Sequence, residues 1–154
     1  MRESSQKRDD RFELNRFIKA QDTIYDVALW ELKNGRKRSH WMWFIFPQID
    51  GLAQSSTSKF YALKSMEEAR AYLNHPVLGK RLKECAEAVL AVEEHSVSEI
   101  FGYPDDLKLK SSLTLFASVA DGESVFTSLL NKCFNGERDL RTLELLEIVE
   151  EKHD

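Results

Sequence analysis

The chain is mildly acidic and ordinary in composition: 154 residues, 42% hydrophobic and 31% charged, with a formal net charge of −4. This length predicts one globular domain with a single core. The absence of a basic face or stripe argues against general DNA binding. With only 6 glycines and 3 prolines, a turn-rich β-sandwich is not expected either.

The cysteines and the start of the chain indicate which metal sites and which cellular locations to expect. Cys85 and Cys133 have neither a CxxC spacing nor a neighbouring histidine pair, so we expect no metal site and no cofactor. No apolar run approaches the roughly 18 residues of a membrane span, and no N-terminal signal is recognisable. We therefore expect no membrane partner and a cytoplasmic location. Residues 1–9 are predicted to be a flexible charged tail and residues 10–150 the globular domain.

The first predicted helices lie between Asp10 and Asn34, where apolar residues recur at helical steps. The spacing is irregular near Gln21, which predicts one short helix followed by a second that Asp22 caps. Gly35 supplies the helix stop.

Residues 39–49 contain the segment SHWMWFIFPQ, whose secondary structure stays open. Nearly every position is apolar, which matches neither helix nor strand periodicity. Ser39 can cap one or two helical turns that end before Pro47. The alternative is a short buried strand, and in either case a loop rich in Gly, Ser and Thr follows.

Helices with recognisable ends account for most of the rest. Capping boxes are predicted at Ser65 with Glu68 and at Ser96 with Glu99, and Pro76 is expected to open the helix between them. Three later helices are predicted: one after the turn at 102–104, where alternating leucines also permit a strand, one over 125–134 that Asn135 ends, and one that Asp139 caps. The expected fold is mainly α, a single compact domain of about six to eight helices around a central aromatic segment, with at most one short irregular strand.

Candidate site residues begin in the aromatic segment, because no Walker, GxGxxG, GxSxG or HExxH motif is present. Trp41 and Trp43 point to different sides in either a strand or a helix. One can therefore line a pocket and stack a nucleobase, although a purely structural role for both has equal weight. Beside them, His40 is either a structural group or an acid–base catalyst, and Gln48 can read a base or ribose edge.

A second polar group opens the segment at 105–114. Asp105, Asp106 and Lys108 form either a solvated helix start or a set of ligand contacts. In the second interpretation Asp105 or Asp106 is catalytic, Lys108 binds ligand, and the hydroxyls of Ser111 and Ser112 contribute.

Ser39, at the start of the aromatic segment, is a further candidate ligand contact, and three residues from other segments complete the candidate set. Lys37 belongs to a basic cluster at 36–38 that either balances a helix dipole or holds an anion. Lys59 and Tyr61 follow the Ser-rich loop and can contribute ligand contacts from a third segment.

A family resemblance extends from Phe12 to Leu146. The segments HWMWFIFPQ and KLKSSLTLF, in this order, resemble the bacterial and fungal family known as domain of unknown function number 1810. The resemblance implies a compact, mainly α domain. Some members carry a calpastatin-like label, yet calpastatin repeats are disordered segments and this chain has the hydrophobic pattern of a packed domain.

A remoter resemblance is to the NADAR superfamily of N-glycosidase and ADP-ribose-associated domains. It lies in the order of elements and in a serine, here Ser39, that opens a short aromatic helix. The superfamily places an acidic residue after this serine, whereas this chain has His40.

Two functions are consistent with these observations. The first is a domain that binds a nucleotide or an ADP-ribose derivative and, if it is an enzyme, hydrolyses an N-glycosidic bond. The second is a non-catalytic protein-interaction domain in which the aromatic run is structural core.

Overall fold

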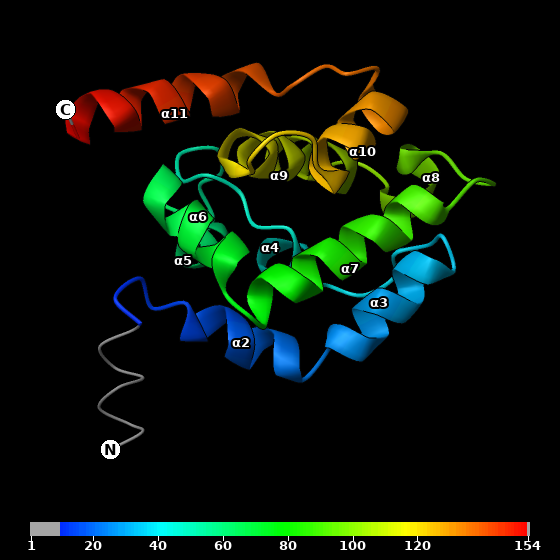
Figure 1. Ribbon diagram of the computed structural model, residues 1–154. Coiled ribbons are helices and arrows are strands. Elements are labelled where there is room, and N and C mark those ends of the chain that lie inside the picture. The colour runs from blue at the N-terminus through cyan, green and yellow to red at the C-terminus, as the bar shows by residue number, and fades with distance from the viewer. Residues whose placement is uncertain (1–9, 154) are drawn as a thin grey trace.

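Ten helices make up the part of the chain that the structure, a computed structural model, describes, namely residues 10–153, with side chains to residue 147. Figure 1 shows them in order: α2 (Asn15–Asp22), α3 (Tyr25–Lys33), α4 (Met42–Ile45), α5 (Ser56–Tyr61), α6 (Met66–Asn74), α7 (Leu78–Ala91), α8 (Val97–Phe101), α9 (Asp105–Val119), α10 (Val125–Phe134) and α11 (Leu140–His153). The predicted mainly α, single-domain fold is confirmed. The predicted tail at 1–9 lies outside the described residues.

The helix number exceeds the expected six to eight because α4, α5 and α8 have only 4, 6 and 5 residues. Segments this short span little more than one turn and carry no helical periodicity in their sequence. None of the described helices is long and apolar enough to span a membrane.

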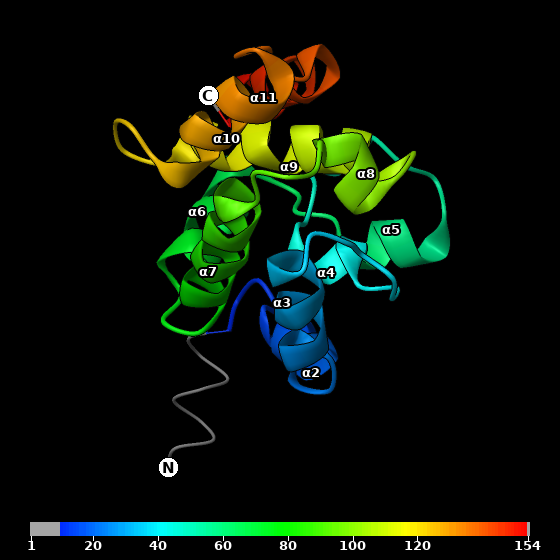
Figure 2. The same cartoon turned by 90° about the vertical axis from the view of Figure 1, so that its right-hand side faces the viewer.

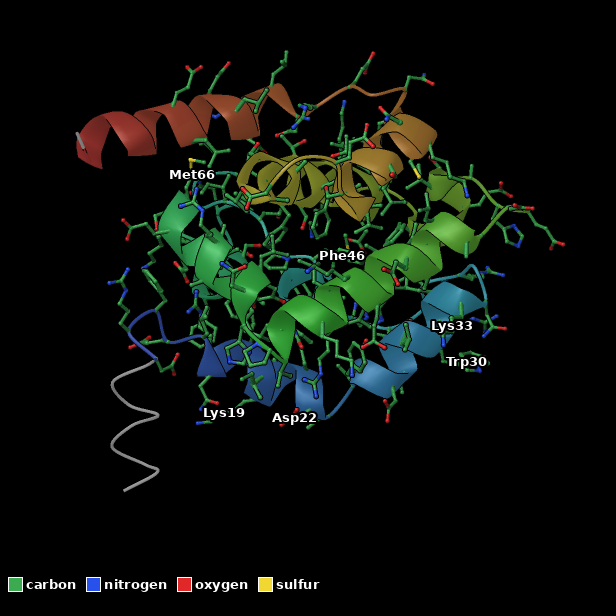
Figure 3. The ribbon with its side chains drawn as sticks, viewed as in Figure 1. Lys19, Asp22, Trp30, Lys33, Phe46 and Met66 are labelled. Atoms are coloured by element: carbon green, nitrogen blue, oxygen red, sulfur yellow. The ribbon has the colours of Figure 1, made fainter. Side chains whose placement is uncertain are left out.

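The helices form layers around α4. In Figures 1 and 2, α9, α10 and α11 lie on one side, α2 and α3 on the opposite side, and α6 and α7 between them. Helix α7 packs against α3, α6 and α10, while α4 contacts α2, α5 and α7. The aromatic segment is therefore central, as predicted, and Phe46 at its end is 1% exposed and lies in the interior in Figure 3.

The predicted break within residues 10–34 is confirmed, but its cap is not. Helix α2 ends at Asp22 and α3 begins at Tyr25 after Ile24, which provides no side-chain cap. The carboxylate of Asp22 instead accepts a hydrogen bond from Arg81 of α7 at 3.1 Å. The stop after α3 is confirmed, because Gly35 has a φ of +72°, which favours glycine.

The two predicted capping boxes differ. Ser96 and Glu99 form a complete, reciprocal box. Ser65 accepts a hydrogen bond from the Glu68 amide, but the Glu68 carboxylate accepts from the amide of Lys64 instead of Ser65. That box is only half formed.

Helix α7 begins later than predicted. Pro76 is not its first residue, since the helix starts at Leu78. The ring nitrogen Nδ1 of His75 accepts hydrogen bonds from the amides of Val77 and Leu78 at 3.1 and 3.3 Å. The carbonyl of His75 also accepts a hydrogen bond from the amide of Gly79 at 2.9 Å, so His75 satisfies donors at the start of the helix and the turn that contains Pro76 leads directly into α7.

The aromatic segment forms a single turn of helix, with Trp41 as its N-terminal neighbour and no side-chain cap. Ser39 does not cap it, because the Ser39 hydroxyl donates to the carboxylate of Glu31 instead. No strand forms here among the described residues: Ile49 makes only an isolated parallel bridge with Leu63. The chain leaves the helical region before Pro47, as expected.

The C-terminal predictions hold. Residues 105–119 are helical, so the strand alternative is excluded. Asn135 ends α10 in a left-handed conformation with φ of 55°. The carboxylate of Asp139 accepts hydrogen bonds from the amide and the hydroxyl of Thr142 at 2.9 and 2.6 Å, which is the expected cap of α11.

Candidate ligand site between α4 and α9

A buried carboxylate organises the chain that enters α4. Glu31 of α3 is 3% exposed. Its Oε1 accepts hydrogen bonds from the amides of Arg38 and Ser39 at 2.9 and 3.0 Å and from the indole nitrogen of Trp41 at 2.9 Å. Its Oε2 accepts from the Ser39 hydroxyl at 2.6 Å. One side chain thereby fixes residues 38–41.

The hydrogen bonds also set the charge of Glu31. Burial raises its pKa, but the bonds from the Ser39 hydroxyl, the Arg38 and Ser39 amides and the Trp41 indole outweigh burial and lower the pKa to about 2. Glu31 is therefore ionised at neutral pH and draws Trp41 into the core. Trp43, two residues further on, is only half-buried. The two indoles therefore do not both face the core, as predicted.

An ion-pair cluster lies beside the indoles. Lys37 Nζ is 2.9 Å from Oδ2 of Asp105, and Lys108 Nζ is 3.6 Å from Oδ1 of the same carboxylate. Lys37 also donates to the Ser39 carbonyl at 2.6 Å and lies 4.9 Å from the centre of the Trp41 ring. Lys108 lies 5.4 Å from the centre of the Trp43 ring. Two cations thus share one carboxylate next to two indoles.

The two lysines differ in what they can still bind. The Lys37 side chain is 8% exposed and is occupied by Asp105 and a carbonyl, so it chiefly holds the cluster together. The Lys108 side chain is 24% exposed and makes the longer ion pair. Lys108 is therefore the cation with capacity for an anionic ligand.

A small cavity lies at the edge of Trp43. Trp43, Gln48, Ser58 and Tyr61 line it, together with residues of the loop at 49–53 and Ala62. Its volume of about 10 Å³ is roughly the space of one water molecule. Three of the predicted ligand contacts, Trp43, Gln48 and Tyr61, are therefore neighbours.

Other predicted residues lie elsewhere. His40 is exposed, and Lys59 lines a separate hollow with Arg11, Phe60 and Lys64. Asp106 is used locally, since it accepts hydrogen bonds from the amide of Leu107 at 2.9 Å and the hydroxyl of Ser98 at 3.4 Å.

The two serines of α9 face inward. Ser111 is 5% exposed and donates to the Leu107 carbonyl at 3.2 Å, while Ser112 is fully buried. Its hydroxyl has no hydrogen-bond partner among the described residues. Neither serine lines the cavity at Trp43. Nor does the described part of the chain gather three His, Cys, Asp or Glu side chains able to hold a metal ion.

A family model described as "Protein of unknown function (DUF1810)" matches residues 11–146. The chain belongs to the DUF1810 family. A solved structure, the conserved hypothetical protein Rv1873 from Mycobacterium tuberculosis, is similar: 51% of its sequence is identical, the match covers 90% of this chain and 99% of that one, and the TM-score is 0.88. No curated protein matches the chain.

Among the buried polar residues of this DUF1810 chain, sequence reasoning missed Glu31 and Gln21. Gln21 is 1% exposed and donates from Nε2 to the Phe44 carbonyl at 2.7 Å and to the Tyr72 hydroxyl at 3.0 Å. Both lie on buried helix faces, where a polar side chain requires a partner. The position of Glu31 on the same helix face as the apolar residues Ala28 and Leu32 is the signal that could have revealed it.

Proposed function

We propose that the surface between α4 and α9 binds a nucleotide or an ADP-ribose derivative. The observation that carries the proposal is the convergence of Lys37, Lys108 and Asp105 beside the half-buried indole of Trp43. Within this ion-pair cluster, two cations face one carboxylate next to an aromatic face. This combination suits a ligand with an anionic phosphate and a flat base.

Each group then has a role. The phosphate pairs with Lys108, while the base stacks on Trp43 and Gln48 offers both a donor and an acceptor to a base or ribose edge. The cavity of about 10 Å³ is too small for a base. Binding therefore requires the loop at 50–55 to move outward and uncover the indole.

Asp105 is the carboxylate that this arrangement offers for N-glycosidic hydrolysis. Water adds to the anomeric carbon as the C–N bond breaks, its proton passes to the departing base, and the carboxylate supports the oxocarbenium-like sugar. The ion pairs to Lys37 and Lys108 hold the carboxylate in place. Asp106 suits this role less well, because its oxygens already accept two hydrogen bonds.

Isothermal titration with ADP-ribose, NAD and free nucleotides tests binding. We expect heat with at least one ligand, a change in tryptophan fluorescence, and loss of binding in Lys108→Ala. Lys59→Ala is the matched control, because that lysine lines a different hollow. If none of these ligands gives heat, or both lysine variants bind equally well, the proposal is wrong. If product forms, equal turnover in Asp105→Asn and the wild type would remove the role of Asp105.

A further inference from the structure

A second concave surface lies between the C-terminal ends of α3 and α7, a cavity of about 640 Å³ that we name the α3–α7 groove. Its lining includes an apolar part formed by Leu29, Ala88, Ala91 and Val92. Most of the rest of the lining is charged, with Glu84, Glu87, Glu93 and Glu94 facing Lys33 and His95. The groove thus combines an apolar surface with an acidic rim, and it shares no residue with the α4–α9 surface.

An exposed aromatic residue lies on α3 next to residues of the groove, although it does not line the groove itself. Trp30 of α3 is 62% exposed, and Val27, one turn before it, is 46% exposed. The Trp30 carbonyl accepts a hydrogen bond from the side chain of Asn34, which lines the groove. Figure 3 shows Trp30 next to Lys33 on the outer side of α3. Large exposed aromatics of this kind are typical anchors of protein interfaces.

The charge around the groove is negative. Four glutamates line it against Lys33 and His95. Among the described residues, Glu87, Glu93 and Glu94 form no ion pair, although Glu84 accepts a hydrogen bond from Tyr25.

The carbonyl groups at the end of α7 already have a cationic partner. Lys132 of α10 donates to the carbonyls of Leu90 and Val92 at 2.6 and 2.7 Å, so the negative end of the helix already attracts one cation from the chain itself. The glutamates beside it remain available to a second source of positive charge.

We propose that the α3–α7 groove docks a basic and apolar segment of a protein partner. Arginine or lysine side chains pair with the rim glutamates, apolar side chains cover Leu29 and Val92, and Trp30 packs against the segment or stacks on an arginine. Charge complementarity selects this occupant: an acidic segment is repelled, and a purely apolar one leaves the rim charges unpaired.

A labelled peptide of alternating arginine and leucine residues is a suitable probe, compared with the same peptide in which glutamate replaces every arginine. We expect fluorescence polarisation to show binding of the first and not of the second. Amide chemical-shift changes should concentrate at the ends of α3 and α7. Lys108→Ala should leave this binding unchanged, which separates it from the nucleotide proposal.

The decisive experiment compares two double variants, each of which removes two negative charges, one pair in the groove and the other on α11. Glu93→Gln with Glu94→Gln should weaken peptide binding by about fivefold or more, and Trp30→Ala should weaken it as well. Glu144→Gln with Glu147→Gln on α11 is the matched control, since both residues are exposed and lie outside the groove. Equal loss in the two double variants would mean non-specific attraction and overturn the proposal. Shift changes elsewhere, no binding, or a peptide-independent homodimer that covers Trp30 would overturn it too.

Discussion

The indole nitrogen of Trp41 donates a 2.9 Å hydrogen bond to the carboxylate of Glu31, and both side chains are buried. The same carboxylate accepts three further hydrogen bonds from Arg38 and Ser39. The approach to α4 therefore depends on a charge contributed by another helix. Removing or neutralising the charge of Glu31 should therefore destabilise the whole aromatic segment.

Glu31→Ala is expected to destabilise the protein by about 3 kcal/mol or more, because four donors lose their acceptor in a buried site. Glu31→Gln retains an acceptor oxygen and should cost less, about 1–2 kcal/mol. Urea unfolding gives both values. Glu144→Ala, at an exposed position, should change stability by less than about 0.5 kcal/mol. A similar result for Glu31→Ala would contradict the assigned role.

The free energy of unfolding should also depend on pH, because Glu31 titrates at low pH. Its pKa is about 2 in the folded protein against 4.5 ordinarily. A lowered carboxyl pKa stabilises the fold above the ordinary value, and that contribution is lost as pH falls from about 4.5 towards about 2. The stability difference between wild type and Glu31→Gln should therefore shrink as the pH falls through this interval, because the Glu31 carboxyl group becomes neutral. A constant difference, measured by urea unfolding at each pH, would contradict it.

The two cysteines should react unequally. Burial raises the pKa of Cys85 to about 12 and raises the pKa of the half-buried Cys133 less far. Iodoacetamide at pH 8 should therefore label Cys133 slowly in the native protein and Cys85 only after unfolding in urea, because the thiolate is the reactive form. Peptide mass spectrometry distinguishes the sites. Equal labelling of both in the native state would show that the interior around Cys85 opens readily.

Gly79→Ala is expected to be severe. A Cβ built on Gly79 would lie 1.9 Å from the backbone oxygen of Leu73, so α6 and α7 would have to separate. We expect a loss of about 3 kcal/mol or more in thermal or urea unfolding. Gly122→Ala is a useful comparison, because its φ of +68° is strained for alanine while nothing lies within 4 Å. It should cost only about 1 kcal/mol, and equal losses would mean that packing at Gly79 is not the cause.

Most of the successful sequence predictions rest on residues that lie close together in the sequence. The Ser96–Glu99 box, the stop at Gly35 and the cap at Asp139 depend on residues within four positions of one another, so they could be predicted. The different burial of Trp41 and Trp43 agrees with the expectation, from backbone periodicity, that the two indoles do not both face one core.

Two of the wrong predictions share a different cause: a partner outside the local segment competes for the side chain. Ser39 donates to Glu31 instead of capping α4, and Asp22 accepts from Arg81, 59 positions away, instead of capping α3. For the candidate site, sequence reasoning grouped Lys59 with Lys108 because both are cationic. The turn of α5 places Lys59 in another hollow, and no periodicity could have shown this.

The bridge between Ile49 and Leu63 has a consequence for engineering. The amide of Asp50 donates to the Leu63 carbonyl at 2.8 Å, and the amide of Leu63 donates to the Gln48 carbonyl at 2.9 Å. These two hydrogen bonds hold together the points at which the loop leaves the core and returns to it. Loop closure costs only about 0.6 kcal/mol for each doubling of length. A peptide inserted after Gln54, in an exposed stretch of this loop, should therefore leave the fold intact. The loop between Ile49 and Leu63 is a suitable position for displaying an inserted peptide.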